Sequence, residues 1–235
     1  MAIANLTGQL ASQFNGGGVT TVVKAYPGDN TTGNLLVACL NSQTSTSSIT
    51  YSLNDTAGNT WSRAATFHNT LIPGHAEIWY AMNAIGSANT VTATASSEVS
   101  NLAITLQEYS GAATASALDG VATGATRDAN PSITIDPGNL TTTVSGDLIV
   151  SFVLWDSQYT YSLTPPPMTA GSGFTERVDF NPVAGLTHSA QDKVAGGAGS
   201  EATAWANDGN VWVAVAASFK AAGGVTRKWI LKKTP

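Results

Sequence analysis

The sequence predicts an all-β protein: an antiparallel β-sandwich of jelly-roll-like architecture with an internal pseudo-twofold repeat. Short apolar segments alternate with turns rich in Gly, Pro, Asn and Asp, and no window carries an apolar stripe of helical period. The chain also repeats its own pattern. Gly33 and Gly146 open matching segments 113 positions apart, and Tyr109 and Phe219 close matching segments 110 positions apart, so short insertions and deletions alone separate the copies.

The first copy covers about residues 19–111. Between its predicted strands lies the turn Asn54–Asn59, where an Asp or Asn side chain caps the backbone and Gly58 supplies a positive φ. Apolar and β-branched residues concentrate in the predicted strands at 20–26, 35–40, 48–53, 60–67, 77–82, 89–95 and 102–109.

The second copy covers about residues 132–221. Its strands are predicted at 132–135, 148–155, 159–163, 174–180, 188–194, 201–205 and 211–220. Residues 111–131 separate the copies and contain Leu118, Val121 and Arg127, which favours an ordered traverse over a flexible linker. We therefore expect one sandwich over residues 1–224, with both copies contributing strands to each sheet, and a basic arm at 225–235. Two tandem sandwiches are the alternative.

Composition restricts the classes of partner. Charged residues make up 11% of the 235 residues, against about a quarter in a typical protein, and Thr, Ser and Asn take their place. Net charge is −5, but four of the ten basic residues fall within the last nine positions. The remaining body carries about −9, which argues against nucleic-acid binding outside the tail, because phosphate contacts need a basic surface.

The single cysteine, the N-terminal residues and the apolar runs bear on where the protein is synthesised. Cys39 lies inside an apolar run and is expected to be a buried, inert thiol. The first residues show no basic start followed by an apolar stretch, so no signal peptide is expected. No apolar run is long enough for membrane insertion. We expect synthesis in a cytoplasm.

Histidine and glutamate spacing raises the question of a metal site. His75 and Glu77 fall on one face of a predicted strand, with His68 nearby in sequence. His188 follows His75 by 113 positions, so we assign the histidine to the repeated scaffold at the same strand start. A residue that recurs with the scaffold is better explained structurally, and we expect no metal.

Enzyme chemistry is not indicated. Gly171-Ser172-Gly173 lacks the spacing and the strand–turn–helix setting of a nucleophile elbow. The aspartates are scattered beside turns rather than paired across an evident cleft. No glycine-rich phosphate loop precedes a helix. We expect no catalytic residues and no cofactor.

One aromatic segment suggests a binding site. Trp155, Asp156, Tyr159 and Tyr161 join two predicted strands and mix aromatic faces with polar groups, as carbohydrate sites do. A loop folded onto the edge of the sandwich is the interpretation that we favour. The remaining aromatics alternate with small or polar residues and are expected in the core: Trp61, Trp79, Tyr80, Tyr109, Trp205 and Trp212.

The basic arm has an apolar centre between cations. A disordered solubilising end is one interpretation of this arm, and strand addition to the acidic surface of a neighbouring subunit is the one that we favour. The candidate assembly residues are Arg227, Lys228, Trp229, Ile230, Lys232 and Lys233.

Several motifs together form a pattern that can be compared with known families. In the first half they are Gly-Asn-Leu-Leu-Val, Asp-Thr-Ala-Gly-Asn-Thr-Trp, Ile-Trp-Tyr-Ala-Met-Asn and Glu-Tyr-Ser-Gly, and in the second half Gly-Asp-Leu-Ile-Val and Gly-Ser-Gly-Phe-Thr-Glu-Arg. Over residues 19–221 this pattern resembles β-sandwich modules of tailed-phage virion proteins and bacterial surface proteins. The resemblance implies a jelly-roll-like, non-enzymatic display or attachment module. It carries over no functional residue.

These observations predict a non-enzymatic virion structural or accessory protein, such as a capsid decoration or fibre component, that acts through assembly. Its expected partners are other virion or surface subunits, including further copies of itself. The expected location is the virion, with the cell surface or the extracellular space as the alternative. The alternative function is a carbohydrate-binding or host-attachment module, with a glycan as partner.

Overall fold

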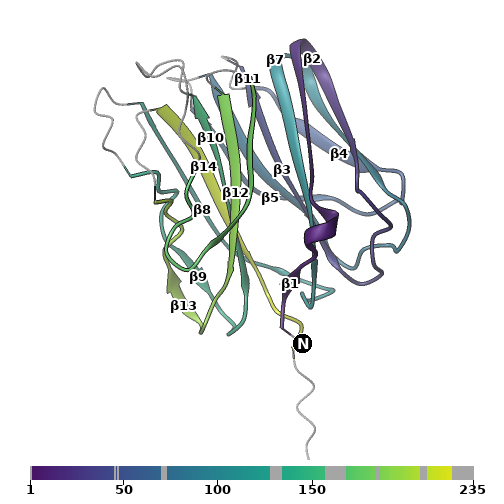
Figure 1. Ribbon diagram of the computed structural model, residues 1–235, viewed down its shortest axis with the longest axis vertical. Helices are drawn as coiled ribbons and strands as arrows, with labels where there is room; N and C mark the ends of the chain where they lie inside the picture. The colour runs from purple at the N-terminus through teal and green to yellow at the C-terminus, as the bar shows by residue number, and fades with distance from the viewer. Residues whose placement is uncertain are drawn as a thin grey trace, which may run out of the picture.

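The computed structural model describes residues 2–44, 46, 48–69, 73–127, 134–156, 168–183, 186–206 and 211–223 (Figure 1). Apart from one 3-10 turn, η1 (Thr7–Gln9), the assigned elements in these ranges are strands. The all-β antiparallel sandwich predicted from the sequence is confirmed. The described residues include no helix that meets the length and apolarity needed to cross a membrane.

Each half of the chain forms one main sheet. The first half contributes β1 (Ala4–Asn5), β2 (Ala11–Ala25), β3 (Leu35–Gln43), β4 (Tyr51–Asp55), β5 (Ser62–Asn69), β6 (Gly74–Ala81) and β7 (Thr90–Ser110). The second half contributes β8 (Leu118–Arg127), β9 (Leu140–Thr142), β10 (Leu148–Asp156), β11 (Thr175–Val183), β12 (Leu186–Val194), β13 (Gly199–Glu201) and β14 (Val211–Phe219).

The predicted repeat is confirmed by the order of the strands. The first sheet runs β1-β7-β3-β6-β5, with β2 and β4 also paired to β7, and the second runs β11-β12-β10-β14-β8. The series β7-β3-β6-β5 therefore corresponds to β14-β10-β12-β11. Register agrees as well, because Leu35 pairs with Tyr109 in the first copy and Leu148 pairs with Phe219 in the second.

The two copies also share a β-bulge in their edge strands. A β-bulge between Arg63 and Ala65 in β5 is matched by one between Glu176 and Val178 in β11, at the same distance of 113 positions. A bulge places one extra residue in a strand and bends it. The two copies therefore share their edge geometry as well as their strand order.

Two expectations about connectivity are wrong. In the described residues the copies do not exchange strands: each main sheet is built from one half of the chain, since antiparallel neighbours close in sequence pair with little loop entropy. The segment read as a traverse forms β8, which pairs with β14. Its glycines allow close passage of the chain, since a Cβ at Gly120 would lie 2.6 Å from the Thr141 carbonyl oxygen.

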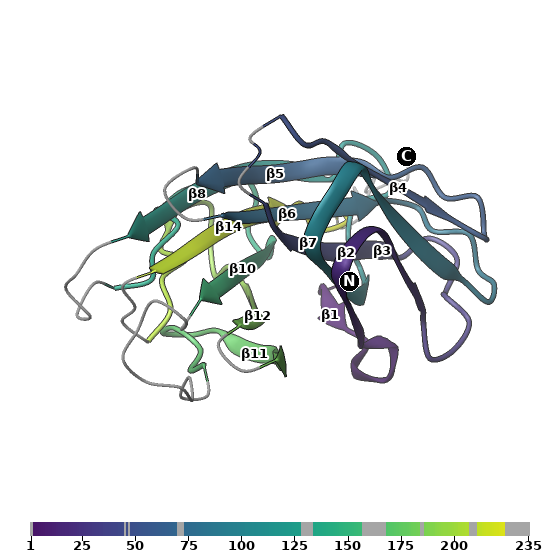
Figure 2. The ribbon, with the colours of Figure 1, turned by 90° about the horizontal axis from the view of Figure 1, so that it is seen from above.

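The two sheets meet face to face around a shared core (Figure 2). Leu35, Val37 and Cys39 of the first sheet pack in one cluster with Val150 and Phe152 of the second. Cys39 is buried, as expected, and burial raises the pKa of its thiol. Each large apolar side chain buried here contributes about 1.5–3 kcal/mol, so this cluster is the main attraction between the halves.

The outer faces of both sheets are covered too. The 21-residue strand β7 curls, and with β2 and β4 it folds over β3 and β6, so that Leu36 and Leu40 are buried against Leu53 and Val91. In the second half the β9–β13 ribbon lies beside a cluster that includes Leu140. Burial on both faces explains why β3 and β10 have continuous apolar sequences rather than alternating ones.

A polar contact also ties the sheets together. The Tyr109 hydroxyl of β7 lies 2.8 Å from Asp192 Oδ2 of β12, and Arg177 Nε and Nη2 each donate to the same carboxylate at 2.8 Å. Nearby, Thr105 Oγ1 and His188 Nε2 lie 3.2 Å apart. Tyr109, Asp192, Thr105 and His188 are buried, and the Tyr109–Asp192 and Thr105–His188 contacts each join a residue of one sheet to a residue of the other.

We predict that Tyr109→Phe lowers the free energy of unfolding by about 2 kcal/mol, since it removes a buried hydrogen bond to a charged carboxylate. The phenyl ring itself should fit, because Phe219 occupies the equivalent position. Urea denaturation measures the difference. The control is Tyr80→Phe, whose partly buried ring contacts Phe219. Equal stability of Tyr109→Phe and the wild type would contradict the role assigned to this hydroxyl.

Candidate functional site

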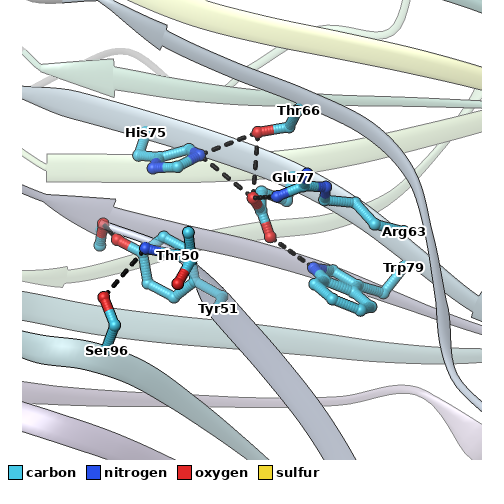
Figure 3. A network of polar contacts seen from close by, with 9 residues as sticks. Thr50, Tyr51, Arg63, Thr66, His75, Glu77, Trp79 and Ser96 are labelled. Atoms are coloured by element: carbon cyan, nitrogen blue, oxygen red, sulfur yellow. Dashed lines mark hydrogen bonds and ion pairs between the residues drawn. The ribbon is translucent and has the colours of Figure 1, made fainter. Parts of the chain in front are cut away.

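A dense polar cluster lies on the outer face of β5 and β6, around the Glu77 carboxylate (Figure 3). Thr66 Oγ1 donates to Glu77 Oε1 at 3.0 Å, Arg63 Nη1 donates at 3.1 Å, and His75 Nε2 lies 3.2 Å away. The indole N–H of Trp79 donates to Oε2. The strands build this arrangement simply: His75, Glu77 and Trp79 alternate on β6, so they share one face.

Burial and hydrogen bonding compete at Glu77, whose side chain is 1% exposed. Desolvation raises the pKa of the carboxyl, but the hydrogen bond and charge of His75, the Trp79 indole and the Arg63 guanidinium together outweigh it and lower the pKa. A carboxylate held by four donors is stabilised in its ionised form. The cluster is therefore built as an internal anion site around the Glu77 carboxylate.

The neighbouring rings complete this cluster. Tyr51 packs edge-on against His75 with ring centroids 4.9 Å apart, and burial raises the pKa of Tyr51 to about 12. His68 packs on the other side of His75, and its Nε2 lies 3.2 Å from the Thr44 carbonyl oxygen. In the described part of the chain, no three His, Cys, Asp or Glu side chains are arranged to hold a metal ion.

The assignment of His188 to the repeat position of His75 is wrong. Leu40 pairs with Glu77 in the first copy and Val153 with Ser189 in the second, so His188 is equivalent to Ala76. A shift of one residue reverses the face. His188 consequently lies between the sheets against Phe152 and Phe180, where burial lowers its pKa to about 3 and keeps it neutral.

The second copy contains a contact like that between Thr66 and Glu77, but with the carboxylate and the hydroxyl on the opposite strands. Thr66 pairs with Glu77 in the first copy, and at the equivalent positions Asp179 pairs with Ser189, whose hydroxyl donates to the Asp179 carboxylate at 2.9 Å. Each copy thus places one carboxylate and one hydroxyl across the same strand pair, from opposite strands. The sequence pointed to His75 and Glu77 but not to Thr66, because a cross-strand partner is visible only once register is known.

The residues considered for glycan contact lie at one end of the second sheet. Trp155 is 5% exposed and packs with Met168, Trp205 and Trp212. Asp156 ends β10, while its side chain, Tyr159 and Tyr161 lie outside the described residues, so the glycan hypothesis stays a prediction. The arm residues Arg227, Lys228, Trp229, Ile230, Lys232 and Lys233 also lie outside them.

The remaining candidate is a sheet edge. In the described residues β11 pairs with β12 alone, so its other backbone edge has no strand beside it. Glu176 and Asp179 lie on the outer face of this strand, opposite Gln191 and Ser189. Burial, and then the charge of Asp179, raise the pKa of Glu176. An unpaired strand edge with carboxylates beside it is suited to a cationic peptide in extended conformation.

No family model, no curated protein and no solved structure matches this chain.

We predict that Glu77→Gln lowers the free energy of unfolding at pH 7 by about 2–3 kcal/mol, because charge-assisted hydrogen bonds are lost in a buried site. Since the folded pKa of Glu77 is lowered from 4.5, its contribution is complete above that value and is lost as pH falls through the lower folded pKa. The gap between wild type and variant should therefore narrow below about pH 4.5.

Chemical denaturation at neutral and acidic pH measures this gap. The matched control is Glu98→Gln, which removes the same charge from an exposed position on β7 and should leave stability unchanged within about 0.5 kcal/mol. A gap for Glu77→Gln that is constant with pH would show that the ionised carboxylate is not the stabilising form.

Proposed function

We propose that this chain is a non-enzymatic structural or accessory protein of a virion, of the capsid decoration or fibre type, and that it acts through assembly. The observation that carries this proposal is the use of buried charged groups for internal contacts. Glu77, Glu108 and Asp192 are each held by several donors from the same molecule. This arrangement favours a stable building block.

Glu108 illustrates how the loops are fixed. Its carboxylate accepts hydrogen bonds from Asn30 Nδ2 at 2.8 Å, Asn34 Nδ2 at 2.6 Å and the Thr31 backbone N–H at 2.8 Å. The Asn89 side chain continues the chain of contacts to Asp55 at 3.0 Å. Loops held by buried amide–carboxylate contacts lose little further entropy on association, which favours a protein that presents a rigid surface to a neighbour.

Charge distribution supports association between copies. The body carries about −9 and the last nine residues carry four cations, so the two parts of one chain are complementary to each other. Such complementarity guides encounter and orientation between subunits and is weakened by salt. The low content of charged residues and the Thr- and Asn-rich composition also agree with the proposal of a virion component.

Sedimentation velocity of the full chain over a range of concentrations tests this proposal. We expect the full chain to form oligomers and a chain ending at residue 224 to be monomeric, because the arm supplies the cations. Oligomers of the full chain should weaken at high salt, as ion pairs are screened. A full chain that stays monomeric at high concentration, with its arm removed readily by protease, would contradict assembly as the function.

A further inference from the structure

We propose that the free edge of β11 is the acceptor for the C-terminal segment 227–233 of a second copy, which adds to the sheet as an extra strand. This inference rests on the proposed function and specifies the surfaces involved. It follows from three features of the described residues: an edge left open by the fold, carboxylates beside that edge, and the direction in which the chain leaves its own sheet.

The repeat produces two equivalent edges, and the fold covers one of them. β5 and β11 correspond to each other, each at the end of its sheet. β5 packs against β8 and β14 of the other sheet, whereas β11 packs on β12 and has no comparable contact with β1 or β2 in the described residues. Figure 2 shows the sheets converging at β5 and β8 and separating toward β11 and β1.

Carboxylates mark the open edge. Glu176 has no ion-pair partner in the described part of the chain, and the charge of Asp179 adds to burial in raising its pKa. Arg177 lies between them in sequence but donates both its bonds to Asp192, so it does not neutralise the edge. A cation placed beside Glu176 would relieve this repulsion. The equivalent position on the covered edge is Arg63, which has the opposite charge.

The side chains of β11 and of the arm have matching patterns. On β11, Glu176 and Asp179 face outward, while Val178 and Phe180 lie on the inner side, both partly buried. In an extended arm, alternate residues face opposite sides. Lys228, Ile230 and Lys232 would share one face, and Arg227, Trp229, Leu231 and Lys233 the other. One face of the added strand thus brings cations to the carboxylates, and the other brings Trp229 and Leu231 to the apolar side chains.

Chain direction favours a second copy over the molecule's own edge. Leu148 pairs with both Phe219 and Val194, so β14 ends at the same end of the sheet where β11 begins with Thr175. An arm laid directly along its own β11 would run parallel to it. The pairings among the described strands are antiparallel, and antiparallel ladders are slightly more stable per residue. A second copy can approach in that direction.

Charge reversal in the full chain tests this pairing. We expect Glu176→Lys to raise the dissociation constant of the oligomer at least about tenfold, equivalent to about 1.4 kcal/mol. A double variant, Lys228→Glu with Lys232→Glu, should have a similar effect. The control Glu98→Lys makes the same charge change at an exposed site on β7 and should assemble as the wild type does. Circular dichroism verifies that each variant is folded.

Mixing the two assembly-deficient variants gives the decisive result. The native arm of the Glu176→Lys variant can dock on the native edge of the arm variant, so the mixture should assemble although neither variant does so alone. Failure of the mixture to recover assembly would overturn docking between copies. If Glu176→Lys assembled normally while removal of the arm abolished oligomers, the acceptor would lie elsewhere and the proposed function would stand.

Hydrogen exchange of the wild-type chain provides a test without substitutions. In the oligomer, the β11 amides that point away from β12 should exchange more slowly than in dilute monomer, because they become hydrogen-bonded to the added strand. Unchanged exchange of these amides on oligomer formation would overturn the proposal. A wild-type chain that forms no oligomer at any concentration would remove both this inference and the proposed function.

Discussion

The central constraint on this molecule is that its main strands are buried on both faces. The inner faces of β3 and β10 meet in the shared core, and their outer faces are covered by the curled part of the first sheet and by the β9–β13 side of the second. A polar side chain on such a strand has no access to water, so it must find its partners within the protein. The Glu77, Glu108 and Asp192 contacts are consequences of this burial.

The comparison of the two copies supports this explanation. At one cross-strand position the carboxylate belongs to β6 in the first copy and to β11 in the second, as Glu77 and Asp179. At another, Asn34 donates to Glu108 in the first copy, while in the second the position of Asn34 is taken by Asp147, whose carboxylate accepts from the Val144 and Ala221 backbone N–H groups. A buried site of this kind needs one carboxylate and its hydrogen-bond donors, and either strand of the pair can supply the carboxylate. The scaffold therefore specifies the pairing and leaves the identity of each partner free.

The sequence predicted those features that depend on local pattern. The repeat, the positions of most strands and the turn at Asn54–Asn59 follow from spacing and turn chemistry, and the turn is confirmed: Asp55 accepts the Gly58 N–H and Gly58 has φ +82°. β7 was predicted as two strands, and its pairing does change between them: β2 and β4 pair with its first part, β2 and β3 pair with its second part, and the β2 register shifts in between. β8 was missed because its Ala-, Thr- and Gly-rich sequence pairs through the backbone.

The candidate site was predictable only in part, because register is not a local property. The shared face of His75 and Glu77 follows from alternation along one strand, whereas their contacts with Arg63 and Thr66 depend on how β5 lies against β6. The position of His188 shows that an error of one residue in aligning the copies is enough to give a wrong prediction. An offset of one residue between copies moves this ring from the outer face to the space between the sheets.

Duplication followed by face-to-face packing leaves an asymmetry that local pattern does not reveal. Two equivalent edge strands result, and among the described residues β5 packs against the other sheet while β11 has no comparable contact with it. An uncovered edge invites pairing with any extended chain, and charged side chains are a common protection against this. Glu176 and Asp179 would repel a second β11, since like charges would meet, but they would attract a strand carrying lysines. The same two carboxylates can thus oppose indiscriminate edge pairing and select a cationic partner.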